Sequence, residues 1–182
     1  MQIEPTIIPG CFQLFPQKQF DVRGNFVKIY NENIYKELNL KTDFKEEYYS
    51  TSVKNVLRGL HFQIPPKEHE KVVYCVWGEV FDVVVDLRKN SPMYGKFQSF
   101  NLSSDKANML YISAGLAHGF YVLSDISIMI YKTTSLYSPQ HDSGILWNSV
   151  DINWPSDNPI VSSRDKSFST LSEYKSPFIF KG

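Results

Sequence analysis

The sequence predicts an all-β fold: a barrel or double-sheet jelly roll with short peripheral helices, formed by residues 1–182 as a single domain. Short runs rich in Val, Ile, Phe and Tyr alternate with turn residues along the chain. No repeat, low-complexity linker or break in composition divides the 182 residues, a length that suits one well-buried domain. Aromatic residues form 15% of the chain, which suits a β-rich protein with a wide, lined cavity.

The strands are predicted from these apolar runs. Residues 56–63 (VLRGLHFQ) form the first of them. Residues 72–77 and 80–87 are expected to pair as a hairpin with Gly78 near its turn, because a glycine separates two strand-like runs. Further strands are expected at 96–102, 109–112, 118–123 and 126–133.

Two short helices and an irregular tail complete the expected chain. Residues 33–38 (NIYKEL) are the clearest helix candidate, and residues 103–106 (SSDK) form a second. The tail after Pro155 is polar and rich in serine, so we expect it to wrap the barrel in irregular structure.

The composition excludes some classes of partner. The chain has 19 basic and 19 acidic residues, so it offers no electrostatic case for non-specific binding to nucleic acid or to an anionic membrane. Cys11 and Cys75 make no disulfide framework, and Cys75 lies in an apolar run where a buried free thiol is expected. Neither a leader peptide nor a run of about 18 apolar residues is present, so we expect a cytoplasmic protein.

The stretch VLRGLHFQ places Arg58 and His61 three positions apart in an apolar strand. An odd spacing points two side chains to opposite faces of a regular strand. Gly59 indicates a bulge or a close approach that re-aims one of them. The alternative is an ordinary barrel strand with a solvated arginine and a hydrogen-bonded core histidine.

Other polar residues interrupt the apolar runs. Asp82 and Asp86 are four apart and share a face, which either lines a polar cavity or meets solvent. His118 lies between small residues at a strand start, as a turn histidine or at the mouth of a cavity. Lys71 and Tyr131, taken alone, read as an exposed lysine and a core tyrosine.

The histidines also allow a metal site. His61, His69, His118 and His141 with a carboxylate would suit zinc, iron or manganese. Gln63 follows His61 where a metal-binding barrel of this type would usually carry a second histidine. We therefore expect no metal and keep a metal-dependent enzyme as the alternative.

Together these segments resemble the dTDP-4-dehydrorhamnose 3,5-epimerase family, from about Phe20 to Asp165 and with order and spacing preserved. The similar segments are VLRGLHFQ, Lys71, GEVFDVVVDLR (78–88), SPMYGKF (91–97), AGLAHGF (114–120), YKTT (131–134), Gly144-Ile145 with Trp147, DINWP (151–155) and SSRD (162–165). The resemblance implies a cupin jelly-roll homodimer that acts, without metal or cofactor, on nucleotide-linked 4-keto-6-deoxy sugars for surface polysaccharides such as lipopolysaccharide and capsule.

The resemblance assigns four catalytic roles. His61 matches the general base that removes a proton next to the keto group, and Asp165 matches the carboxylate that orients this histidine. Lys71 matches the cation beside the developing oxyanion. Tyr131 matches the proton donor on the opposite face of the sugar, where an ordinary tyrosine stays mostly protonated.

The remaining matches concern substrate binding. Arg23, Arg58 and Arg164 fit contacts to pyrophosphate and nucleotide, for which a planar fork of donors is suited. His118 matches a residue near the sugar. The same resemblance places three further residues at the substrate: Phe20, Gln63 and Tyr48.

The chain departs from the family near the expected nucleobase. Typical members have F-x-E where this chain has Lys28 after Phe26-Val27, and a Q-D-N-type segment where it has Glu46-Glu47-Tyr48. An ionised Glu46 only accepts hydrogen bonds, which favours the paired N–H donors of guanine over thymine. We therefore expect a GDP-linked sugar slightly ahead of dTDP, with CDP also open.

Several alternatives stay open from the sequence. The sugar is a hexose or a heptose, and epimerisation occurs at C3, at C5 or at both, since this depends on how the sugar turns in the cavity. The competing classes are a metal-dependent cupin isomerase or oxygenase and a non-catalytic sugar-binding cupin.

Overall fold

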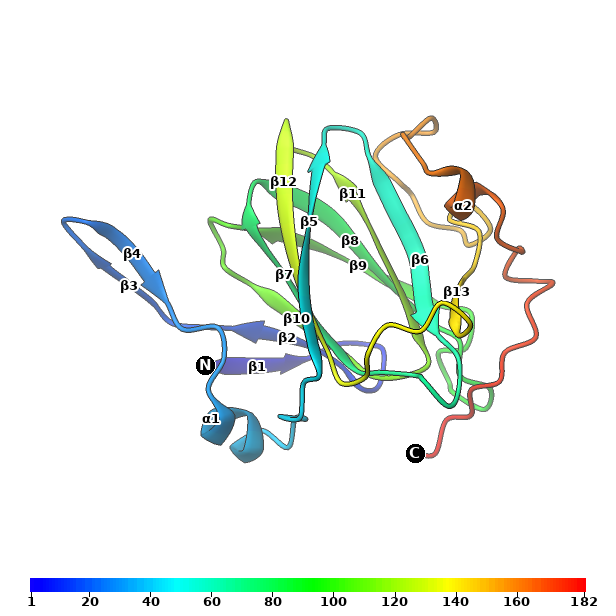
Figure 1. Ribbon diagram of the computed structural model, residues 1–182, viewed down its shortest axis with the longest axis horizontal. Coiled ribbons are helices and arrows are strands. Elements are labelled where there is room, and N and C mark those ends of the chain that lie inside the picture. Colours follow the sequence, from blue (N-terminus) through cyan, green and yellow to red (C-terminus); the bar gives the residue numbers. More distant parts are fainter.

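Two antiparallel sheets face each other in the computed structural model, which describes residues 1–182 (Figure 1). The six-stranded sheet has the order β1 (Gln2–Pro5), β2 (Cys11–Phe15), β10 (Met109–Ile112), β7 (Lys71–Trp77), β12 (Ile126–Thr133) and β5 (Glu46–Val53). The five-stranded sheet has the order β13 (Asp142–Gly144), β6 (Leu57–Gln63), β11 (Leu116–Val122), β8 (Glu79–Asp86) and β9 (Phe97–Ser103). This arrangement confirms the predicted double-sheet jelly roll.

The pairing predicted for residues 72–77 and 80–87 is wrong. Both runs are strands, but β7 pairs with β10 and β12, whereas β8 pairs with β11 and β9 in the other sheet. Gly78 joins them at a corner, with φ +79, and a Cβ there would lie 2.2 Å from Ile126 O. The glycine therefore turns the chain from one sheet to the other.

The helix predicted at 33–38 is confirmed as α1 (Glu32–Glu37), which begins where the Asn31 side chain accepts a hydrogen bond from Ile34 N. The helix predicted at 103–106 is wrong. Ser103 ends β9, and the next residues form a turn into β10 in which Ala107 has φ +53, a conformation that cannot continue a helix. The tail is mostly irregular, as expected, but it contains one turn of helix, α2 (Ser163–Lys166).

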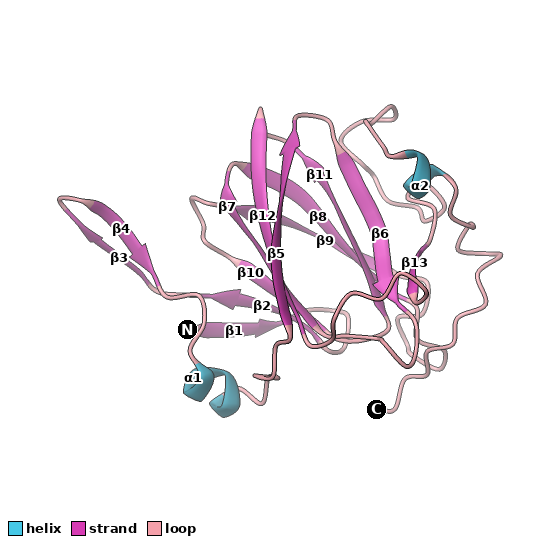
Figure 2. Cartoon of the chain, viewed as in Figure 1, coloured by secondary structure: helices cyan, strands magenta, loops and turns pink.

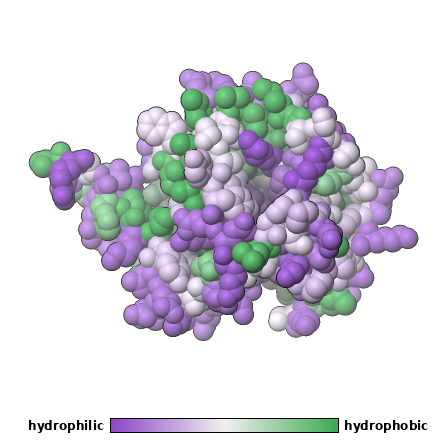
Figure 3. Space-filling model, in the orientation of Figure 1, coloured by the Kyte–Doolittle hydropathy of each residue, from purple (hydrophilic) through white to green (hydrophobic).

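A hairpin of β3 (Lys18–Asp21) and β4 (Gly24–Val27) projects away from the barrel (Figures 1 and 2). Its outer end is uncovered. Phe20, Val22 and Phe26 are 72%, 105% and 60% exposed, and the space-filling view shows apolar green at its outer end (Figure 3). Apolar side chains on an isolated arm are typical of a surface that meets another molecule.

Aliphatic side chains from both sheets fill part of the space between them. Val73 and Leu110 of one sheet pack against Val84 and Leu102 of the other. Cys11 and Cys75 are buried free thiols, as predicted for Cys75. No helix is long or apolar enough to cross a membrane. Beside this aliphatic layer a pocket opens between the sheets, and polar residues of the strands line it.

Candidate active site

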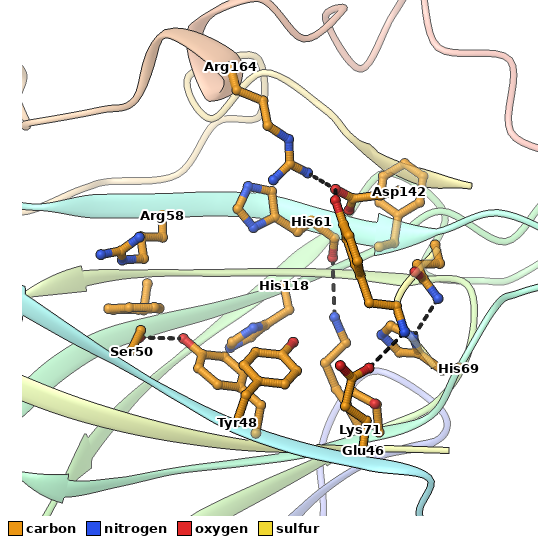
Figure 4. Close-up of a pocket in the computed structure, with 16 residues that line it drawn as sticks. Glu46, Tyr48, Ser50, Arg58, His61, His69, Lys71, His118, Asp142 and Arg164 are labelled. Carbon is orange, nitrogen blue, oxygen red and sulfur yellow. Dashed lines mark hydrogen bonds and ion pairs between the residues drawn. The ribbon is translucent and has the colours of Figure 1, made fainter. Parts of the chain in front are cut away.

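A cavity of about 420 Å³ opens between the two sheets (Figure 4). It is lined by nine of the thirteen residues predicted for the site: Glu46, Tyr48, Arg58, His61, Gln63, Lys71, His118, Tyr131 and Arg164. A tenth, Asp165, lies directly behind His61. Residues scattered over more than a hundred positions therefore meet around one space.

The bulge expected at Gly59 is present. Strand β6 pairs with β11 in two registers, His118 opposite His61 and Phe120 opposite Arg58, with a shift between them. At this shift Gly59 has φ +142, and a Cβ would lie 2.6 Å from the Cα of Gly119. The bulge removes the odd spacing, so Arg58 and His61 line the same cavity.

His61 is held by a buried carboxylate from the tail. Its Nε2 lies 2.9 Å from Asp165 Oδ1, and Asp165 Oδ2 accepts a hydrogen bond from Gly59 N at 3.1 Å. Burial alone would raise the pKa of Asp165, but the hydrogen bonds from His61 and Gly59 lower it below its ordinary value. An ionised carboxylate only accepts, so Nε2 carries a proton, and Nδ1 is the nitrogen that has the free lone pair in the neutral imidazole.

Lys71 is 6% exposed and lines the cavity beside His61. Its Nζ donates to the carbonyl oxygen of His61 at 3.3 Å. Burial lowers the pKa of Lys71 to about 8, although the charges of Asp142 and Asp82 oppose the shift. The interpretation of Lys71 as an exposed lysine, from its residue type alone, is therefore wrong. Its ammonium lies buried in the cavity at neutral pH.

The face shared by Asp82 and Asp86 is buried, so the solvent alternative is wrong. Asp82 Oδ2 lies 2.8 Å from His118 Nε2, while Oδ1 has no hydrogen-bond partner. Burial raises the pKa of Asp82, and His118 and Lys71 oppose the shift. Asp86 instead forms a structural ion pair with Arg88 at 2.7 Å.

Tyr131 lies on the opposite sheet from His61, so the two side chains face each other across the cavity. Its hydroxyl lies 3.2 Å from Ser50 Oγ, and its ring stacks on that of Tyr48. Burial raises the pKa of Tyr131 far above its ordinary value. The phenol is therefore protonated at neutral pH and is able to donate.

The segment after β12 closes one side of the cavity. Its role in the site was not predicted from the sequence. Tyr137 N donates to Glu46 Oε2 at 2.7 Å, and Tyr137 Oη lies 3.3 Å from Asp142 Oδ2. Asp142 also pairs with Arg164 at 2.6 Å (Figure 4). The available clue was position, since a loop that follows the strand of Tyr131 must cross the end of the barrel.

Gln63 and His69 hold the segment that follows β12 through hydrogen bonds. The Gln63 amide donates to Lys67 O at 2.8 Å and to Leu136 O at 3.3 Å, and it accepts from Ser138 N at 2.7 Å. His69 Nδ1 lies 3.2 Å from Gln63 Nε2, and burial, with the charge of Lys71, lowers the pKa of His69 to about 3. Gln63 therefore has little capacity left for a substrate.

The cavity does not include the three predicted residues of the β3–β4 region. Phe20 and Arg23 lie on the projecting hairpin, where Arg23 pairs with Asp21, and Lys28 follows β4 as an exposed residue. None of them lines the cavity of its own chain. The reason is the outward direction of the hairpin (Figure 1).

The histidines do not form a metal-binding group. No cluster of three or more His, Cys, Asp or Glu side chains has suitable geometry. His61 and His118 each pair with a different aspartate, and His141 forms a hydrogen bond with Ser138. The metal-dependent alternative is therefore not favoured.

Known proteins resemble the chain over nearly its whole length. The model of a family described as dTDP-4-dehydrorhamnose 3,5-epimerase matches residues 5–173. A dTDP-4-dehydrorhamnose 3,5-epimerase from Shigella flexneri is 44% identical over 168 residues, which cover 91% of this chain and 93% of the relative.

Solved structures agree. The dTDP-6-deoxy-D-glucose-3,5-epimerase from Legionella pneumophila, in complex with dTDP-4-keto-L-rhamnose, superposes with a TM-score of 0.94 at 32% identity, covering 100% of this chain and 99% of that one. The dTDP-4-dehydrorhamnose 3,5-epimerase from Bacillus anthracis, with TDP and PPi bound, gives 0.90 at 35% identity, covering 93% and 98%. The fold is thus of the cupin type, as the sequence resemblance implied.

Gln63→Leu should loosen the segment over residues 134–141, because Ser138 N loses its acceptor and Leu136 O its donor. We expect amide hydrogen exchange in this segment to rise roughly tenfold or more. Gln98→Leu, which removes the bond to Ile7 N elsewhere on the surface, should leave the segment unchanged. Unchanged exchange together with weaker substrate binding would instead assign Gln63 to the substrate.

Proposed function

Because the chain belongs to the dTDP-4-dehydrorhamnose 3,5-epimerase family and is an isomerase, we propose that it epimerises a nucleotide-linked 4-keto-6-deoxy sugar at C3 and C5 without a cofactor. One observation carries the proposal. His61 and Tyr131 project from opposite sheets into the cavity that Lys71 also lines. A base and an acid on opposite sides of a planar intermediate are what inversion requires.

The C4 keto group makes the protons on C3 and C5 acidic. His61 takes one of these protons on Nδ1, and the electron pair of the C–H bond moves through a new C=C bond onto the C4 oxygen. When the enolate collapses, the same carbon takes a proton from the Tyr131 hydroxyl on the opposite face, which inverts the centre. The tyrosine then regains a proton from solvent, and His61 releases its own.

Lys71 stabilises the charge that forms between these two transfers. Its ammonium is buried, so it interacts with the enolate oxygen through little water. Asp165 keeps His61 in the tautomer whose free nitrogen faces the sugar. A protein that only bound the sugar would have no need for a buried acid, base and cation in this arrangement.

We propose dTDP as the nucleotide, in place of the GDP expected from Glu46 and Lys28. Glu46 Oε2 accepts from Tyr137 N, which takes up one of the two oxygens that a bidentate contact to guanine needs, and Lys28 lies outside the cavity. The two solved relatives hold a dTDP sugar and TDP. The product would then serve the synthesis of rhamnose-containing surface polysaccharide.

Arginines at the mouth of the cavity suit the diphosphate. Arg58 donates Nε to Ser52 Oγ at 2.9 Å and Nη2 to Thr51 O at 3.3 Å, which leaves Nη1 for a phosphate oxygen. Arg164 brings a second charge to the same rim. Binding energy from the nucleotide would thus place the reacting carbon near His61.

We also propose a homodimer in which each β3–β4 hairpin reaches the cavity of the partner. The hairpin carries Phe20 and Arg23, which resemble substrate-binding residues but lie outside the cavity of their own chain. Its apolar side chains are uncovered in one copy (Figure 3). A two-fold dimer would bury both hairpins and complete both sites.

The reaction itself is tested by proton exchange in D₂O, followed by NMR of the sugar protons. We expect the C3 and C5 signals of a dTDP-linked 4-keto-6-deoxy sugar to disappear. His61→Ala should slow this by about 10²–10⁴-fold while still binding dTDP in a calorimeter. Faster exchange with the GDP-linked sugar would overturn the choice of nucleotide, and no exchange with either would overturn the reaction.

The shared site is tested by mixing two inactive variants, His61→Ala and Phe20→Ala/Arg23→Ala, under conditions that exchange subunits. A mixed dimer with hairpins acting on the partner has one site with both defects and one intact site. Activity should therefore recover to about a quarter of that of the wild type. If hairpins act within their own chain, or the protein is monomeric, no activity returns.

The pH dependence of the rate should show the titration of Lys71. Because burial lowers the pKa of Lys71 to about 8, the ammonium is lost and the rate should fall as pH rises through 8. Lys71→Met should lower the rate at pH 7 about a hundredfold and remove this alkaline limb. Lys67→Met, at an exposed lysine, is the control. A limb that persists in Lys71→Met would assign it to another group.

A further inference from the structure

The ring of Tyr131 is stacked against a second tyrosine that the mechanism above does not use. Tyr48 on β5 and Tyr131 on β12 are direct partners across the two antiparallel strands. Their ring centroids lie 4.8 Å apart with an angle of 14° between the planes. Strand register therefore fixes this contact, because direct partners place their side chains on the same face.

A neighbouring residue on the same strand holds the other end of the phenol. Ser50 lies two positions after Tyr48, so both point into the cavity, and its Oγ lies 3.2 Å from Tyr131 Oη. Strand β5 thus restrains Tyr131 twice. Tyr48 fixes the plane of its ring, and Ser50 fixes the position of its hydroxyl.

Beyond the place at the substrate that the resemblance gives it, the Tyr48 side chain has no task in the core. Its hydroxyl forms no hydrogen bond with the protein, and the residue is 46% exposed although it borders the cavity. An aromatic ring left half in water contributes little to the core. What it does provide is one flat side of the space that Tyr131 occupies.

On the basis of the proposed reaction, we propose that Tyr48 is a positioning residue that clamps the Tyr131 ring and aims its hydroxyl at the enolate carbon. Proton donation requires the two heavy atoms to come within about 3 Å, so a loosely held phenol delivers its proton less often. The clamp therefore acts on the second proton transfer alone. Proton removal by His61, on the other sheet, does not depend on it.

Because the two proton transfers use different residues, the ratio of inverted to non-inverted product can be measured. In D₂O, an enolate that takes a deuteron from Tyr131 gives inverted, deuterated sugar. When the proton on His61 first exchanges with D₂O, an enolate that then takes a deuteron from His61 gives deuterated sugar of unchanged configuration. The initial ratio of the two products reports how well Tyr131 competes, and it is insensitive to the amount of folded enzyme.

Tyr48→Ala should lower the ratio of inverted to non-inverted product about three- to tenfold, the value of one aromatic pair. Tyr48→Phe keeps the ring and should keep the product ratio of the wild type. Tyr48→Leu keeps apolar bulk without a flat ring and should lower the ratio as Tyr48→Ala does. It serves as the second variant in case Tyr48→Ala folds poorly. Tyr49→Ala is the matched control, since Tyr49 is 70% exposed and follows on the opposite face of β5.

An unchanged ratio in Tyr48→Ala and Tyr48→Leu would overturn the clamp, even if all rates fell together. A loss in Tyr48→Phe equal to that in Tyr48→Ala would also overturn it, because the hydroxyl rather than the ring would then matter. Failure of the wild type to exchange any proton would reject the proposed function instead. The two failures are therefore distinguishable in one experiment.

Discussion

The arrangement of the site depends on the buried carboxylate of Asp165. One oxygen holds His61, and the other accepts from the backbone of Gly59, so a single side chain fixes both the histidine and the bulge that directs it. Asp165 is itself held by Ser162, whose hydroxyl caps the short helix α2 by accepting from Asp165 N at 3.1 Å. The irregular tail thus has a structural reason to return to the barrel.

Much of this structure could be predicted from the sequence because the residue composition of a run indicates a strand. The runs at 109–112 and 126–133 were predicted to the residue. The partners of β7 and β8 could not be predicted, because alternation shows that a run is a strand and not which sheet it joins. Gly78 marks a change of direction in either case, a hairpin or a corner between sheets.

The site was predictable to a different extent. His61, Lys71 and Tyr131 are ordinary residues one by one, and only the resemblance of whole segments brought them together. Tyr137 and Asp142 were missed because their loop carries no strand pattern. The pairing of Asp82 with His118 resolved a question that the sequence left open, since two aspartates on an apolar strand suit either solvent or a polar cavity.

His61 and Tyr131 belong to different sheets, and this separation links the site to the rest of the barrel. An aliphatic layer lies between the same two sheets, and Val73 and Val84 belong to one cluster in it. Because such an interior is densely packed, a lost methyl group leaves a cavity into which the surrounding structure collapses only in part. In the proposed reaction, the packing of the core would thus act as a spacer between the base and the acid, and the fidelity of inversion would be a property of the whole barrel.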